Sequence, residues 1–148
     1  MRKFWLLEKH KQEIEYTELD SKALRFKIDA DTEFKFRTSD NNPYNTVFDW
    51  DRIKPSYSFF FDFDNNEDII KKKLDESKLK NSSFVYIETL SDIPIIRTRT
   101  EYFIANWIDF VNANAGQGSI CITDDFKLLM EFTDDFKYYL FSNFIITP

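Results

Sequence analysis

Residues 123–127 read Thr-Asp-Asp-Phe-Lys, and residues 133–137 repeat the same five residues. Each copy is followed by an apolar run, over residues 128–130 and residues 138–140. Aspartate favours tight turns, and turn residues that recur at this spacing between apolar runs are typical of an antiparallel β-meander. The sequence therefore predicts three strands joined by two tight turns, near residues 119–123, 126–132 and 136–146.

The segment before the meander has the pattern of an amphipathic helix. Phe103, Trp107, Phe110 and Val111 follow the three-to-four-residue spacing of one helix face, and Ile104 and Ile108 widen its apolar surface. Thr98 and Glu101 have the spacing of a capping box, and Gly116 suits the left-handed position that ends a helix. We therefore predict a helix over residues 99–115.

Four more elements are expected upstream. An asparagine cap and two acidic residues open a helix predicted over residues 66–80, and lysines follow near its far end. Alternating apolar residues predict a β-hairpin over residues 22–37 and a strand from Tyr57 to Phe63. A segment rich in β-branched and aromatic residues predicts a strand over residues 83–90.

The chain has 148 residues, which is enough for one hydrophobic core, and no linker rich in glycine, serine or proline. We predict a single α+β domain over residues 1–148: an antiparallel sheet, two main helices and the C-terminal meander. The only glycines are Gly116 and Gly118. Walker A loops, dinucleotide-binding glycine loops and the nucleophile elbow of α/β-hydrolases need glycines at several set positions, so these sites are excluded.

The net charge is −6 and is unevenly distributed. Residues 28–68 hold ten acidic and four basic residues, and residues 100–148 hold seven acidic and two basic ones. Binding to nucleic acid depends on clustered Lys and Arg, so the composition disfavours it. An acidic surface instead attracts basic partners and speeds their association.

Cysteine usage and hydropathy bear on the compartment. The single cysteine, Cys121, has no second cysteine in the chain for a disulfide, which favours a reducing environment. No run of about 18 apolar residues occurs, and the apolar stretch near the N-terminus is too short for a signal peptide. We expect a cytoplasmic protein that does not bind membranes.

The polar constellations argue against a metal, a cofactor or a catalytic site. Four aspartates could supply oxygen ligands, but successive meander turns lie at opposite ends of the strands, so the pairs should be far apart: Asp124, Asp125, Asp134 and Asp135. The stretch that begins at Asp62 resembles an EF-hand loop without its glycine and its final glutamate, although Asp62 and Asp64 leave weak cation binding open. His10 lies in a polar stretch expected to face solvent, and Cys121 is expected to fill a buried strand position.

One region mixes acidic and aromatic residues in the way that protein interfaces do. The proposed partner-binding residues are Tyr44, Asp49, Trp50, Asp51 and Tyr57. Aromatic anchors surrounded by charge are typical of interfaces with other proteins. The alternative is that Phe48 and Trp50 belong to the core and only their acidic neighbours face solvent.

Three segments of the last third, residues 105–107, 114–120 and 129–135, resemble bacterial toxin immunity proteins of the contact-dependent growth inhibition type. The resemblance implies a cytosolic protein without enzymatic activity that binds and neutralises a cognate toxin domain, often a nuclease. The acidic composition is compatible with a partner whose active-site cleft is basic. Another interaction adaptor, or a ligand-binding protein or enzyme with a site that the sequence does not reveal, stays open, as does the oligomeric state.

Overall fold

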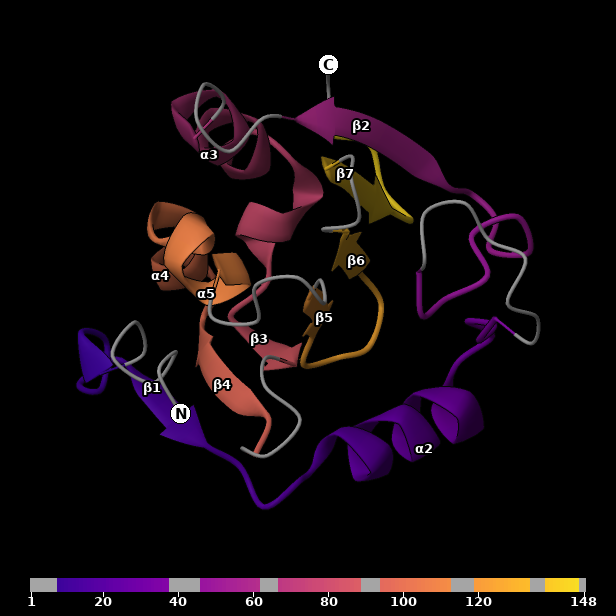
Figure 1. The fold of residues 1–148 in the computed structure, drawn as a ribbon, viewed down its shortest axis with the longest axis horizontal. Helices are drawn as coiled ribbons and strands as arrows, with labels where there is room; N and C mark the ends of the chain where they lie inside the picture. The colour runs from indigo at the N-terminus through magenta and orange to yellow at the C-terminus, as the bar shows by residue number, and fades with distance from the viewer. Residues whose placement is uncertain are drawn as a thin grey trace.

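In the part of the chain that the computed structural model describes, seven antiparallel strands form one sheet in the order β1-β4-β3-β5-β6-β7-β2 (Figure 1). The structure describes residues 8–37, 46–61, 67–88, 94–112, 119–133 and 138–146. The strands are β1 (Ile14–Tyr16), β2 (Tyr57–Phe61), β3 (Phe84–Glu88), β4 (Ile96–Arg99), β5 (Ser119–Thr123), β6 (Leu129–Phe132) and β7 (Tyr138–Ser142).

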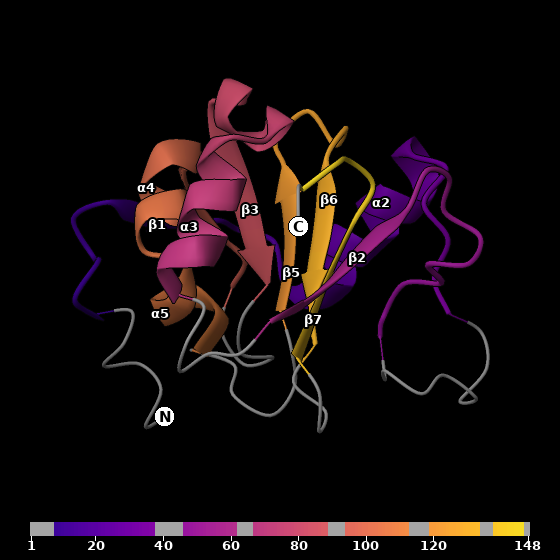
Figure 2. The same ribbon diagram turned by 90° about the horizontal axis from the view of Figure 1, so that it is seen from above.

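Helices cover both faces of this sheet. One face carries α3 (Glu67–Asp75), the short 3₁₀ helix η1 (Lys78–Asn81), α4 (Thr100–Ala105) and α5 (Trp107–Asn112). The other face carries α2 (Ser21–Asp31) together with the segment from residue 46 to residue 53. Figure 2 shows the sheet between these two layers.

Strand β5 lies at the centre of the sheet and is buried along its whole length. Because side chains alternate along a strand, Cys121 packs into the core under α3–α5, whereas Ile120 and Ile122 pack into the core under α2. The burial of Cys121 agrees with the strand position expected for it. Two separate cores therefore share one central strand.

The C-terminal meander and its first turn confirm the sequence prediction. Strand β5 pairs with β6, and β6 pairs with β7, both antiparallel. In the first turn the carboxylate of Asp125 accepts hydrogen bonds from the Thr123 hydroxyl at 2.7 Å and from the Lys127 N–H at 3.1 Å. These bonds, the first above all, lower the pKa of Asp125. The second turn, with Asp134 and Asp135, lies outside the described residues.

The predicted hairpin over residues 22–37 is wrong, because most of this segment is helix α2. The apolar residues Leu24 and Ile28 are four residues apart, so they share a helix face, and both are fully buried. Phe26 fits the strand alternation but points outward. The start of the helix is set by Asp20, whose carboxylate accepts a 2.7 Å hydrogen bond from the Ala23 N–H.

The predicted helix over residues 99–115 is confirmed in its buried face but not in its start or its continuity. Thr98 is not a cap, because it belongs to β4 and its hydroxyl donates to the Glu13 carbonyl at 2.7 Å. The helix breaks at Asn106, whose N–H is shared by the carbonyls of Tyr102 and Phe103. Gly116, the expected end of the helix, lies outside the described residues.

The remaining elements partly match expectation. Strands β2 and β3 lie within the predicted strand segments, and the predicted helix over residues 66–80 is divided into α3 and η1. Ser77 separates these two helices and caps η1 by accepting from the Leu79 N–H at 3.2 Å. Strands β1 and β4 were not predicted from the sequence. Among the described residues, no helix is long and apolar enough to cross a bilayer.

The cap of α2 gives a direct test of the helix that replaces the hairpin. Asp20→Ala should lower the free energy of unfolding by about 1 kcal/mol, because the N–H of Ala23 loses its acceptor. Urea unfolding followed by circular dichroism measures this loss. Glu18→Ala, two residues upstream and exposed, is the control and should change stability little. Equal stability of the two variants would contradict the capping role of Asp20.

Candidate functional site

Trp50 is a core residue, which corrects the proposal that it anchors a partner at the surface. Its side chain is 6% exposed and stacks on Phe141 with ring centroids 5.7 Å apart. Phe48 is fully buried beside it. The alternative interpretation, in which both aromatics belong to the core, is therefore correct.

The other proposed binding residues have different surroundings. Asp49 is half-buried and lies 3.9 Å from the Arg52 guanidinium, whereas Asp51 is exposed. Tyr57 is exposed at the start of β2. Tyr44 lies outside the described residues. Asp49 and Asp51 therefore remain available at the surface, but they have no exposed tryptophan between them.

A buried carboxylate holds the segment from residue 46 to residue 50 against the sheet. Glu131 projects from β6, and its two oxygens accept hydrogen bonds from the Val47 N–H at 2.6 Å, the Phe48 N–H at 3.2 Å and the Trp50 Nε1–H at 3.0 Å. These donors would otherwise be buried without acceptors. Glu131 thus replaces a strand as the hydrogen-bonding partner of an irregular segment.

Burial raises the pKa of Glu131 to about 7, against the opposing effect of its three hydrogen-bond donors and the charge of Arg25. Arg25 comes from α2 and forms an ion pair with Glu88 of β3, its Nε lying 3.1 Å from the carboxylate. The two acidic side chains at this sheet face are therefore both held by contacts to the layer that covers it.

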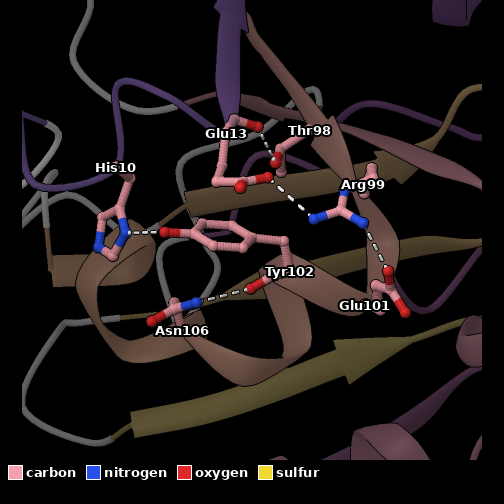
Figure 3. Close-up of polar contacts among 7 residues, drawn as sticks. All are labelled: His10, Glu13, Thr98, Arg99, Glu101, Tyr102 and Asn106. Carbon is pink, nitrogen blue, oxygen red and sulfur yellow. Dashed lines mark hydrogen bonds and ion pairs between the residues drawn. The ribbon is translucent and has the colours of Figure 1, made fainter.

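His10 is buried, which corrects the expectation that it faces solvent. Its side chain is 5% exposed, and both ring nitrogens have partners: Nδ1 lies 2.6 Å from the Tyr102 hydroxyl, and Nε2 lies 2.8 Å from the Asp109 carboxylate. Figure 3 shows the imidazole facing the Tyr102 hydroxyl. The ring also lies against Phe110, with centroids 5.2 Å apart.

Ion pairs extend this cluster to β1 and β4. The Arg99 guanidinium contacts the Glu13 carboxylate at 2.9 Å and the Glu101 carboxylate at 2.7 Å (Figure 3). Burial raises the pKa of Tyr102, and the negative charges of Glu13 and Asp109 add to this effect. The phenol therefore stays protonated and can donate to a neutral imidazole.

The His10–Asp109 contact resembles the histidine–carboxylate pair of many active sites, but protein groups occupy both nitrogens of the imidazole. Both ring nitrogens of His10 are occupied by protein groups, Tyr102 and Asp109, and the ring is 5% exposed, so the imidazole lies inside the protein and away from solvent. Through these hydrogen bonds and ion pairs, the cluster holds residues 8–16 against α4 and α5. Sequence reasoning missed it because its members are about a hundred residues apart in the chain.

Two further features of the described residues bear on a binding or metal site. A groove of about 410 Å³ runs between α3 and α4, with charged side chains of both signs along its walls: Asp68, Lys71, Lys72, Asp75 and Glu101. These side chains lie on outward helix faces, so the groove is an open surface feature. Among the described residues, no three His, Cys, Asp or Glu side chains come together as they would around a metal ion.

The exposed residues of α2 form the candidate interface. Phe26 is 73% exposed, and Asp29 and Ala30 follow it at the spacing that places residues on one helix face. Asp31 and Glu33 are also exposed at the C-terminal end of the helix. The helix start at Asp20 is the sequence signal that could have identified this face.

Backbone hydrogen bonds place the segment that carries Asp49 and Asp51 beside the chain that follows α2. The N–H of Asp49 donates to the Lys35 carbonyl at 2.8 Å, and the N–H of Arg37 donates to the Val47 carbonyl at 2.9 Å. The chain that leaves α2 therefore lies beside the segment that carries Asp49 and Asp51. The exposed lysines Lys22, Lys27 and Lys35 lie along the same segments. We call Phe26, Asp29, Asp31, Glu33, Asp49 and Asp51 the acidic surface.

Comparison of the chain with protein-family models, with curated proteins and with solved structures found no match. Functional inference therefore rests on the geometry described above.

The raised pKa of Glu131 predicts a defined pH dependence of stability. Its pKa is about 7 in the folded chain and about 4.5 in the unfolded chain, so the folded state holds the proton more tightly. The contribution of this group to the free energy of unfolding should fall by about 3 kcal/mol as the pH rises from 4.5 to 7. The difference between wild type and Glu131→Gln in urea unfolding isolates this contribution. A difference that does not change with pH would contradict the assignment.

Loss of the His10 contacts should destabilise the fold. We expect His10→Ala to lower the free energy of unfolding by about 2–3 kcal/mol, because two hydrogen bonds and the packing on Phe110 are removed. Lys11→Ala is the control, since the Lys11 side chain forms an exposed ion pair with Glu8 and its loss should cost less than about 1 kcal/mol. Thermal unfolding of both variants measures the difference. An equal loss of stability in the two variants would contradict a buried, hydrogen-bonded His10.

Proposed function

We propose that this chain is an immunity protein, which binds a cognate bacterial toxin domain in the cytoplasm and masks a basic surface on it. The toxin is proposed to be a nuclease, whose substrate-binding cleft must attract phosphate. The chain acts by occupying that surface and catalyses no reaction. The observation that carries the proposal is an exposed phenylalanine, Phe26, next to acidic residues that weaken the helix on which they lie.

The acidic residues at the end of α2 are unfavourable for the helix itself. Carbonyl groups at a helix C-terminus favour cations, yet the last turn of α2 has no basic residue and contains Asp29 and Asp31. Each carboxylate there costs about 0.3–1 kcal/mol. Residues retained at a cost to stability are often explained by binding.

Phe26 is an exposed aromatic side chain, whereas Trp50 is buried and not available to a partner. A phenylalanine with most of its surface in water gains little by folding and is available to a partner. Aromatic residues at the centre of an interface contribute a large share of binding energy once charged neighbours exclude water around them. Phe26 shares its helix face with the exposed Asp29 and Lys22, so the ring has charged neighbours of both signs.

The net charge supports a basic partner. A chain of charge −6 attracts a positively charged cleft over about 8–10 Å at physiological salt. The carboxylates of the acidic surface would replace the phosphates that a nuclease binds. Such pairing raises the association rate more than it slows dissociation.

The first experiment is expression of this chain with the polypeptide encoded beside it, followed by co-purification. We expect a stable complex, protection of cells from the neighbouring polypeptide, and slower association as salt is raised. A neighbouring polypeptide that is harmless and does not bind would contradict the proposal.

The acidic surface can be tested with a variant that separates folding from binding. The double variant Asp29→Asn/Asp31→Asn should slow association by about tenfold while raising the free energy of unfolding by about 0.6–2 kcal/mol. The control Asp75→Asn/Glu76→Gln removes the same charge from the last residue of α3 and the residue after it, and it should slow association much less. Equal effects of the two double variants would remove the acidic surface from the interface.

The role of Phe26 as the aromatic anchor of the interface can be tested against a second exposed aromatic residue. Phe26→Ala should speed dissociation by about thirtyfold or more, the effect of losing about 2 kcal/mol at an interface centre. Tyr16→Ala removes an aromatic side chain that is 47% exposed on β1, and it should leave dissociation unchanged. Surface plasmon resonance measures both rates.

A further inference from the structure

The two edges of the sheet differ in their protection against other strands. β1 has three residues, one of them Glu15, whose carboxylate pairs with Arg97 at 3.2 Å. β2 has five residues, Tyr57-Ser-Phe-Phe-Phe61, with no charge and no proline. Edge strands usually carry charges, prolines or bulges that prevent pairing with another chain. The edge at β2 has none of these within the strand.

The hydrogen-bonding pattern shows which groups of β2 face outward. The N–H of Thr133 donates to the Tyr139 carbonyl, and the N–H of Asn143 donates to the Leu129 carbonyl, so odd-numbered residues of β7 face β6. Even-numbered residues of β7 therefore bond to their β2 partners, such as Phe59 opposite Leu140.

It follows that Ser58 and Phe60 direct their N–H and C=O groups away from β7. Among the described residues, no hydrogen bond is made to these outward groups. Figure 1 shows β2 at the rim of the sheet, with β7 on its inner side. The Phe60 side chain is 56% exposed, and its ring lies edge-to-face with the Tyr139 ring, with centroids 5.6 Å apart.

We propose that β2 pairs with β2 of a second copy of this chain, antiparallel about a two-fold axis at Phe59. This register places Ser58 of each copy opposite Phe60 of the other, so the outward backbone groups meet and exchange hydrogen bonds. The sheet would then continue across both copies. The pairing is closed, because the two-fold axis pairs the β2 edge of one copy with the β2 edge of the other and leaves neither β2 edge open.

The side chains favour a second copy as the occupant. Each exposed Phe60 lies opposite the small Ser58 of the other copy, which leaves space for the two rings to approach diagonally over one sheet face. No charged residue of one strand meets a like charge on the other, because residues 57–61 carry none. A strand of this composition is complementary to itself.

The interface is small, with five residues from each copy. Interfaces below about 1,200 Å² are typical of weak complexes, so we expect a dimer that forms at micromolar to millimolar concentration. Each copy carries a charge of −6, so added salt should strengthen the dimer by screening repulsion. The proposed toxin complex responds to salt in the opposite direction, which keeps the two proposals separable.

Sedimentation equilibrium over a concentration series tests the dimer. Ser58→Pro removes only an outward N–H, and Phe60→Lys places charge at the edge; each should weaken the dimer by about tenfold or more. Ser58→Ala keeps the N–H and is the matched control. Circular dichroism verifies that each variant is folded, and Phe60→Lys serves if Ser58→Pro does not fold. A wild-type chain that stays monomeric at millimolar concentration, or a dimer unaffected by both variants, would overturn the proposal.

The register has a separate test. Residues opposite each other in a hydrogen-bonded antiparallel pair have Cα atoms about 5.5 Å apart, which is within the range of a disulfide. Under mild oxidation, a mixture of Ser58→Cys and Phe60→Cys chains should form the mixed disulfide in preference to either symmetric one. The native Cys121 is buried and should not react. Symmetric disulfides as the main product would place the axis elsewhere and overturn the register.

Discussion

Burial of the central strand β5 on both faces is the constraint on which the rest of the structure depends. Its alternating side chains enter two different cores, so the chain must supply a cover for each face. Helices α3–α5 provide one cover with regular packing around Trp107. The other cover is one helix, α2, plus an irregular segment whose backbone groups need acceptors inside the protein.

Glu131 resolves this second requirement at an electrostatic cost. Burial raises the pKa of the Glu131 carboxyl group, but the group accepts hydrogen bonds from three donors of the segment from Val47 to Trp50. An apolar residue at this position would leave those donors without acceptors. The same interaction explains why Trp50 is buried, since its indole N–H points to Glu131.

The placement of Trp50 in the core moves the expected interface to the outer face of the same cover. Phe26 and the acidic end of α2 are exposed because Leu24 and Ile28 hold the opposite helix face on the sheet. The edge of β2 is a separate surface with a different chemistry, since it offers backbone groups and aromatic rings and no charge. A charged surface suits a basic partner, and a neutral strand suits an identical one.

Local patterns in the sequence determined the meander, its first turn and the buried face of the helix around Trp107, because turn bonds and helical spacing involve residues close together in the chain. Residues 22–31 were ambiguous, since Leu24, Phe26 and Ile28 fit the period of a strand and of a helix, and only docking onto β5 and its neighbours selects the helix. The roles of His10 and Glu131 were decided by tertiary structure alone. Each acts on partners some eighty to a hundred residues away, and a contact at that distance leaves no local pattern around either residue.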